Sequence, residues 1–293
     1  MKYHRNIVVI ILTLTSFASV AQDASILVTP QWVNERKQDP KLVVLQVGFL
    51  QFDYDREHLP GSRYLWPGWL APDAPTGAYN MPDTKSATEI LQKFGINNDS
   101  YIVVCHIRNE VSPAARMFLT LENLGLKGKV YFLNGGLNAW KNAGLPVTKD
   151  LPIVKRGNIT VKPGDILVDK NYVLNTMNAG KGVIVDARMK IYYDGEPTGN
   201  PRDGHIKGAL NIPYPNMIDQ VNYVFKPVDS LAHYFTPVIP DKKKEIVTYC
   251  FIGQTASVIY MTGRILGYDV KLYDGSLQEW SRLDELPMET TKK

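Results

Sequence analysis

Cys250 follows an apolar run, residues 245–249, and precedes the segment Phe251-Ile252-Gly253-Gln254-Thr255-Ala256. This placement predicts a thiol on a tight loop, at the carboxyl end of a buried strand and facing the first turn of a helix. Backbone N–H groups that converge on such a loop, together with the helix dipole, stabilise a thiolate and any anionic sulfur attached to it. The segment therefore indicates nucleophilic sulfur chemistry. The competing interpretation is a buried cysteine that behaves as a small hydrophobic residue.

The chain repeats itself at a spacing of 140 residues. In each copy an apolar segment is followed by a turn and then by a tryptophan: Asn134-Gly135-Gly136 with Trp140, and Asp274-Gly275-Ser276 with Trp280. Further pairs of residues match in the two copies: Gln46 with Asp186 at the same spacing, and His58 with His205 at a slightly longer one. The sequence is therefore a duplication of one domain-sized unit, which agrees with the two domains expected for 293 residues.

Short β-branched runs alternate with helical patterns along the chain. The runs cover residues 42–47, 101–105, 129–133, 182–186, 245–250 and 270–273, and the clearest helical patterns cover residues 112–124 and 255–266. Such alternation predicts an α/β fold with parallel strands and helices on both faces of each sheet. Residues 145–164 carry three prolines and no helical period, which indicates a linker between the copies. We expect a leader at 1–21, a first domain at 22–148, a linker at 149–164 and a second domain at 165–293.

These motifs together resemble the tandem-domain rhodaneses, the thiosulfate and 3-mercaptopyruvate sulfurtransferase family. The resemblance covers nearly the whole chain after the leader, through Asp186-Ala187-Arg188, residues 204–213, the Cys250 loop and the segment from Asp274 to Trp280. It implies two rhodanese-like domains, each a central parallel sheet of about five strands flanked by helices. It also implies that Cys250 accepts a sulfane sulfur as a persulfide. The sulfur would come from a small donor such as thiosulfate or 3-mercaptopyruvate and pass to a thiophilic acceptor, namely cyanide, a thiol or a protein thiol, without a cofactor.

The residues after Cys250 are expected to form the cradle for this sulfur. A thiolate is the nucleophilic form of cysteine, and loop N–H groups favour it. Phe251, Ile252, Gly253, Gln254 and Thr255 would make the loop, in which Gly253 permits a conformation that a Cβ obstructs. The Thr255 hydroxyl would either donate to the sulfur or cap the following helix. Ala256 would allow close packing at the start of that helix.

Arg188 and Tyr192 are the expected substrate-binding residues outside the loop. Arg188 matches the arginine of the family's Asp-Ala-Arg element. It would either make a bidentate contact to an anionic substrate or form a structural ion pair with a carboxylate. Members of the family usually have a second arginine four residues later, where this chain has Tyr192. Lys190 is the nearest cation that would compensate, provided that the loop bends suitably.

The Cys250 loop departs from the family in a second way. Phe251-Ile252 stands where thiosulfate enzymes have basic residues and mercaptopyruvate enzymes have Gly-Ser. An apolar loop offers no charge to a small dianion and favours a bulkier or less charged donor or acceptor. Sulfur transfer is therefore better supported than either substrate.

The first domain is expected to be non-catalytic. His106 occupies the position of Cys250 and Cys105 precedes it. His106 would either line an interdomain cleft or cap the following segment, and we favour the second role. Cys105 is interpreted as a buried strand residue, and His58 and His205 as hydrogen-bonded residues of their turns. No cysteines and histidines have the spacing of a metal site.

Three functions use a loop cysteine of this kind. The first is a sulfurtransferase, and the second is a sulfane-sulfur carrier with little turnover, which Tyr192 and the Phe-Ile loop leave open. The third is a phosphatase of the same fold. A phosphatase needs an arginine six residues after its cysteine to hold phosphate, and residue 256 is alanine, so this function is excluded.

The N-terminus has the pattern of a secretory signal peptide. Lys2 and Arg5 precede apolar residues 7–14, and small residues follow at 18–21, so we expect cleavage after Ala21 and a periplasmic or secreted protein. The apolar run is shorter than the roughly 20 residues of a transmembrane anchor. Without residues 1–21 the chain has 31 basic and 29 acidic side chains, which gives no reason to expect nucleic acid or a stable membrane anchor. The two cysteines fall in separate domains, so we predict no disulfide between them.

Overall fold

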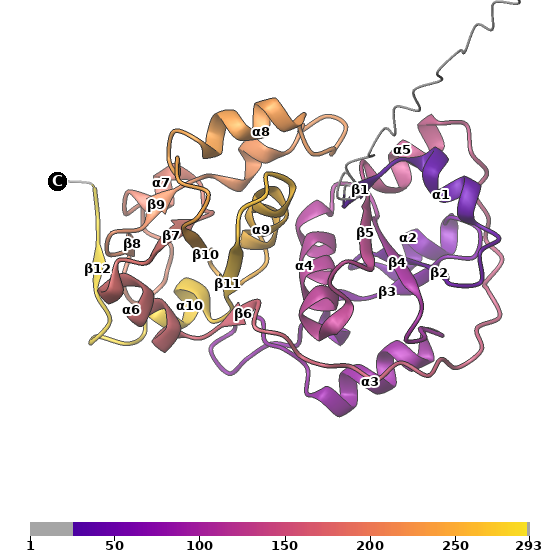
Figure 1. Cartoon of the computed structure of the whole chain (residues 1–293), viewed down its shortest axis with the longest axis horizontal. Coiled ribbons are helices and arrows are strands. Elements are labelled where there is room, and N and C mark those ends of the chain that lie inside the picture. Colours follow the sequence, from indigo (N-terminus) through magenta and orange to yellow (C-terminus); the bar gives the residue numbers. More distant parts are fainter. Residues whose placement is uncertain (1–25, 292–293) are drawn as a thin grey trace, which may run out of the picture.

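The computed structural model describes residues 26–291 as two domains, each built on a five-stranded parallel sheet. Figure 1 shows two lobes that meet along α4 (Val111–Leu121) of the first domain and α9 (Ala256–Ile265) of the second. The predicted α/β architecture, with a parallel sheet in each half of the chain, is confirmed. The predicted leader at residues 1–21 lies outside the described residues.

The first sheet has the strand order β1-β5-β4-β2-β3. Its strands are β1 (Leu27–Val28), β2 (Leu42–Val47), β3 (Arg63–Leu65), β4 (Tyr101–His106) and β5 (Val130–Leu133). The helices of this domain, besides α4, are α1 (Pro30–Arg36), α2 (Gln51–Arg56), α3 (Thr84–Lys93) and α5 (Gly136–Asn142), with a 3₁₀ turn η1 (Pro67–Trp69) and a π-helical turn η2 (Glu122–Leu126) that extends α4.

The second sheet repeats this order as β6-β11-β10-β7-β9. Its strands are β6 (Leu167–Val168), β7 (Gly182–Asp186), β9 (Leu210–Asn211), β10 (Glu245–Tyr249) and β11 (Val270–Tyr273), and a separate antiparallel pair joins β8 (His205–Ile206) to β12 (Met288–Glu289). The other elements are α6 (Lys170–Ala179), α7 (Lys190–Tyr193), α8 (Val228–Phe235), α10 (Ser276–Trp280) and η3 (Tyr214–Met217).

Both faces of each sheet are covered, because successive strand residues point to opposite sides. In the first domain, Val43 and Leu45 pack on the side of α3 and α4, whereas Val44 packs with Trp140 of α5 on the other side. In the second domain, Ile246 faces α8 and α9, and Val247 faces α6 and α10. Strands buried on both faces explain the continuous apolar runs of the sequence.

One hydrophobic core runs through both domains. Met117 and Phe118 of α4 belong to the same buried cluster as Val258 and Met261 of α9. Residues 149–164 contain no helix or strand and lie against the first domain, where the Gly157 N–H donates to the carbonyl of Gln92 at 2.8 Å. The shared core therefore holds α9, which follows the carboxyl end of β10, against the first domain.

Candidate functional site

Cys250 is the first residue after β10, which lies between β11 and β7 near the centre of its sheet. Its N–H donates to Oγ of Ser276 at 3.3 Å, and its carbonyl accepts the N–H of Leu277 at 3.0 Å. The backbone therefore leaves the sheet at this residue and is held by the turn between β11 and α10. For this reason the strand ends at Tyr249, one residue earlier than the sequence predicted.

The loop at residues 251–255 carries unused hydrogen-bond donors. Within the described part of the chain, the backbone N–H groups of these five residues donate to no other group. Gly253 is buried, and the other four residues of the loop are half-buried. These donors lie between the thiol and the first turn of α9, a helix of ten residues whose dipole places partial positive charge at the same end. The loop is thus suited to stabilise negative charge on sulfur.

Three small residues lie at the end of the loop and the start of α9, and their surroundings differ. Gly253 has a φ of +82°, and a Cβ there would lie 3.0 Å from Nη1 of Arg116 and 3.0 Å from the carbonyl oxygen of Asp274. A side chain at this position would be strained and would collide with both neighbours. Thr255 occupies the N-cap position of α9 but makes no side-chain capping hydrogen bond. Ala256 is fully buried at the start of the helix.

Cys250 is buried, with only 1% of the residue exposed. Side chains from both domains surround it. Burial raises the pKa of Tyr79 in the first domain and of Tyr214 in the second, and the nearby Cys250 thiol adds to both shifts. Both phenols therefore stay protonated beside the sulfur. Both cysteines are free, so the prediction that they form no disulfide is confirmed.

Arg188 forms the structural ion pair that was one of its two expected roles. Its Nη2 lies 2.6 Å from Oδ2 of Asp186 and donates to the carbonyl of Gly204 at 2.6 Å, while Nε donates to both carboxylate oxygens. Burial acts to lower the pKa of Arg188, but the Asp186 carboxylate outweighs it and holds that pKa above its ordinary value. Nη1 is buried and has no hydrogen-bond partner among the described residues. The Arg188 guanidinium also lies over the Phe251 ring, 4.8 Å from its centroid.

An open hollow of about 440 Å³ lies outside the loop. Its lining consists of Tyr192, Pro197, Thr198, Asn200, Phe251 and Gln278, none of which is ionised. The Tyr192 ring meets the Phe251 ring edge-on with centroids 5.3 Å apart. Lys190 does not compensate for the missing arginine: its Nζ lies 2.7 Å from Oδ1 of Asp194, four residues along the chain, and is exposed to solvent. The lining of this hollow is partly aromatic and carries no charge.

Three residues of the first domain make four hydrogen bonds to the loop, none of which was predicted from the sequence. The Tyr79 N–H donates to the carbonyl of Ile252 at 2.9 Å, and its hydroxyl donates to Oε1 of Gln254 at 2.6 Å. The Gln254 amide in turn donates to Oγ of Ser112 at 3.1 Å. Nη1 of Arg116 donates to the carbonyl of Gly253 at 3.1 Å. The only sequence signal for these contacts is the single charge of Arg116 within an apolar helical stretch.

The first domain has no reactive group at the position that matches Cys250. His106 ends β4, is fully buried, and its Nδ1 lies 2.9 Å from the carbonyl oxygen of Arg108, so it caps the following segment as favoured from the sequence. Burial lowers the pKa of His106 to about 4, which leaves its imidazole neutral. Burial raises the pKa of the Cys105 thiol well above its ordinary value. A thiol of this kind is inert.

His58 and His205 are structural residues of equivalent turns. Each imidazole stacks on a tyrosine and its Nδ1 lies within hydrogen-bond distance of the carbonyl oxygen of that tyrosine: Tyr54 at 2.8 Å for His58, and Tyr193 at 2.7 Å for His205. The expected hydrogen-bonded role is confirmed for both.

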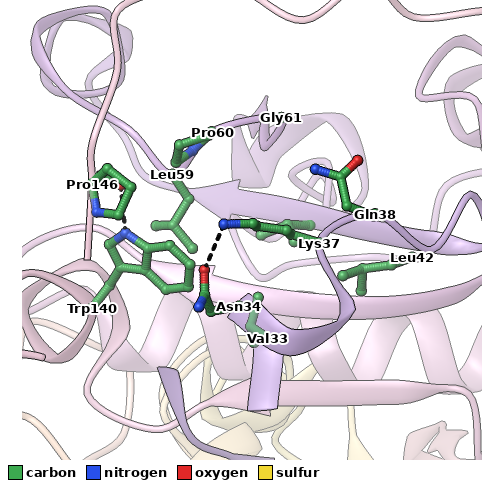
Figure 2. A pocket seen from close by; sticks show the side chains of 11 residues that line it. Val33, Asn34, Lys37, Gln38, Leu42, Leu59, Pro60, Gly61, Trp140 and Pro146 are labelled. Atoms are coloured by element: carbon green, nitrogen blue, oxygen red, sulfur yellow. Dashed lines mark hydrogen bonds between the residues drawn. The ribbon is translucent and has the colours of Figure 1, made fainter. Parts of the chain in front are cut away.

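Figure 2 shows a second hollow, of about 310 Å³, in the first domain. Trp140 and Leu59 form part of its wall, and Nζ of Lys37 donates to Oδ1 of Asn34 at 3.0 Å. Its lining contains no cysteine, histidine or carboxylate. Among the described residues there is no cluster of potential metal ligands, and no helix is long and apolar enough to cross a membrane.

Comparison with known proteins gives the same family over both halves of the chain. The rhodanese-like domain family matches residues 29–143 and again residues 169–283. The chain is 32% identical over 278 residues to the sulfur carrier protein TtuD of Thermus thermophilus. The aligned region covers 90% of this chain and 96% of the relative.

Two further relatives are named as enzymes. A probable 3-mercaptopyruvate sulfurtransferase of Pseudomonas aeruginosa is 29% identical over 279 residues, covering 90% of this chain and 98% of the relative. The crystal structure of the Escherichia coli 3-mercaptopyruvate sulfurtransferase SseA superposes with a TM-score of 0.77 at 25% identity, over 86% of this chain and 98% of that one.

Proposed function

The chain belongs to the rhodanese-like domain family and is a sulfurtransferase, and we propose that Cys250 is the residue that carries the transferred sulfur. The observation that carries this proposal is the loop at residues 251–255, which directly follows Cys250 in the chain and whose five N–H groups have no acceptor among the described residues. No equivalent thiol exists in the first domain, where His106 takes this position.

The reaction has two steps. The Cys250 thiolate attacks the sulfane sulfur of the donor, so that a sulfur–sulfur bond forms to Cys250 while the bond between that sulfur and the rest of the donor breaks. With thiosulfate the leaving group is sulfite. The terminal persulfide sulfur is then attacked by a thiophilic acceptor such as cyanide or a thiol, and the Cys250 thiolate is released. The loop N–H groups stabilise the anionic sulfur in both states, as fixed dipoles do in other sites that bind developing charge.

The donor is a molecule of low charge density. Tyr192 and Phe251 form an aromatic entrance, Lys190 is bound to Asp194, and Arg188 is bound to Asp186. A small dianion such as thiosulfate therefore finds few free cations near the thiol, whereas an organic persulfide, whose leaving group is a thiolate, finds apolar surface. Thiosulfate remains usable through the loop N–H groups and Nη1 of Arg188.

Replacement of each cysteine by serine tests the proposal. Cys250→Ser is expected to abolish sulfur transfer to cyanide with every donor and to keep the native circular dichroism spectrum, because the backbone hydrogen bonds of residue 250 do not use the sulfur. Cys105→Ser is the matched control and is expected to keep nearly full activity. Equal losses from both substitutions would contradict a single active domain.

A second candidate function is sulfur carriage with little turnover. It is favoured by the similarity to a sulfur carrier protein over 90% of this chain and by the uncharged entrance. Counting turnovers distinguishes the two functions: a carrier transfers one sulfur per Cys250 with small acceptors and then stops, whereas a sulfurtransferase continues while donor remains.

We also propose that the protein is exported to the periplasm or secreted. The support is the pattern of residues 1–21, in which two basic residues precede a short apolar run and a small-residue cleavage site. N-terminal sequencing of the protein from the periplasmic or extracellular fraction is expected to begin near Gln22. Recovery of a chain that still starts at Met1 in the membrane fraction would show that the segment is an anchor.

A further inference from the structure

Arg116 extends from the first domain into the site of the second. It lies on α4, is fully buried, and its Nη1 donates to Oδ1 of Asp274 at 2.5 Å and to the carbonyl of Gly253 at 3.1 Å. We propose that Arg116 is a positioning residue for the sulfurtransferase reaction, through which the non-catalytic domain fixes the geometry and the electrostatic environment of Cys250. The inference rests on Cys250 being the residue that carries sulfur.

The two partners of Arg116 belong to the two segments that hold Cys250. Gly253 lies in the loop that supplies the unused N–H groups. Asp274 precedes by two residues Ser276, whose hydroxyl accepts the Cys250 N–H at 3.3 Å. Nη1 of Arg116 therefore joins the loop to the turn, and a movement of this guanidinium would change the distance between the loop donors and the sulfur.

Adhesion between the domains does not by itself explain a buried arginine here. Nε and Nη2 of Arg116 are buried and have no hydrogen-bond partner in the described chain, and the Asp274 side chain is only 15% exposed. Buried ion pairs are often no more stabilising than apolar residues of the same volume, and unpaired donors oppose folding. The neighbouring contacts of α4 with α9 are apolar, so an apolar side chain would join the domains equally well.

The duplicated turn of the first domain provides an internal comparison. Asn134 stands 140 residues before Asp274, in the same turn, and its Oδ1 accepts the N–H of Phe225 from the second domain at 2.8 Å. Each turn is therefore contacted by the opposite domain. The contact is neutral where the turn serves His106, and it is an ion pair where the turn serves Cys250.

A matched pair of substitutions tests the proposal in the full-length protein. Arg116→Met removes the ion pair at the Cys250 loop, and Arg264→Met removes a second interdomain ion pair of equal length, between Arg264 and Glu122 at 2.5 Å. Arg264 lies in the last turn of α9, at the end far from Cys250. Both variants are expected to lose thermal stability, because each leaves a buried or largely buried carboxylate without its cation.

The two variants are expected to differ in chemistry. Arg116→Met should lower kcat for sulfur transfer about tenfold with little change in KM, a loss of about 1.4 kcal/mol in transition-state stabilisation. It should also move the ultraviolet absorbance titration of the Cys250 thiolate to higher pH, measured as the difference from Cys250→Ser. Arg264→Met should change neither. Arg116→Lys, which keeps the charge, should restore part of kcat, and it replaces Arg116→Met in the comparison if the methionine variant does not fold.

Two results would overturn the proposal. In the first, the Arg116 variant keeps the wild-type kcat and the wild-type Cys250 titration. In the second, the Arg116 and Arg264 variants lose kcat equally and in proportion to their loss of thermal stability. The titration needs no sulfur donor. If the Arg116 variant shifts the Cys250 titration although the wild type transfers no sulfur, the positioning role is supported and the proposed function is contradicted. The two failures are therefore distinguishable.

Discussion

At the scale of single residues, the loop that follows Cys250 lies beside a hollow with an uncharged lining. Cys250 is buried, and the N–H groups of the five residues after it have no acceptor in the described chain; Tyr192 and Phe251 line the hollow outside this loop. Arg188 and Lys190, the two nearby cations expected from the sequence, are both paired with carboxylates. We therefore propose that donor choice is decided more by aromatic surface than by charge.

Tyr192→Arg tests this explanation of donor choice. The new guanidinium would enter the hollow next to Phe251, and it should raise kcat/KM for thiosulfate by roughly tenfold, since a charge-assisted contact contributes about 1.5 to 3 kcal/mol. The gain should shrink as salt is added, because the hollow is open to solvent. Lys190→Met is the control and should leave kcat/KM unchanged. Equal thiosulfate activity in the wild type and in Tyr192→Arg, or a large loss in Lys190→Met, would contradict the explanation.

At the scale of elements, the turn between β11 and α10 holds the nucleophile at some expense in backbone strain. Ser276 has a φ of +49° and its hydroxyl accepts the Cys250 N–H and donates to the carbonyl of Tyr273 at 2.9 Å. In the first domain the matching residue is Gly136, with a φ of +55°, which adopts this conformation freely. The serine thus keeps a strained conformation where its hydroxyl serves Cys250.

Two substitutions of Ser276 separate its backbone strain from the role of its hydroxyl: Ser276→Gly and Ser276→Ala. Both remove the hydroxyl and should lower kcat to a similar extent. Only the glycine variant relieves the left-handed conformation, so its free energy of unfolding should exceed that of the alanine variant by about 1 kcal/mol. Thermal or chemical denaturation measures this difference. Full activity in Ser276→Gly would show that the hydroxyl does not position Cys250.

The long elements could be predicted from the sequence, and the short ones could not. Residues 42–47 and 182–186 form strands over the predicted ranges, because strands buried on both faces are continuous apolar runs. β1, β6 and β9 have two residues each, which is too short for any period to be visible. The predicted helix at residues 112–124 ends as an α-helix at Leu121 and continues as a π-helical turn that contains Gly125.

At the scale of the whole molecule, the catalytic site depends on both domains. The nucleophile and its loop follow from the sequence, since residues 245–256 are contiguous. The contacts of Tyr79, Ser112 and Arg116 with this loop join residues more than 130 positions apart, and a local pattern carries no information on such pairs. The first domain, which has no reactive cysteine, shares a core with α9 and contacts the Cys250 loop.

The central claim is that Cys250 carries the transferred sulfur, and intact-mass measurement of the full-length protein tests it most directly. After incubation with thiosulfate or 3-mercaptopyruvate, the wild type should gain about 32 Da, the mass of one sulfur in a persulfide. Peptide mapping should place the sulfur on Cys250, and addition of cyanide should remove it. No gain with any donor, or a gain located on Cys105, would contradict the account.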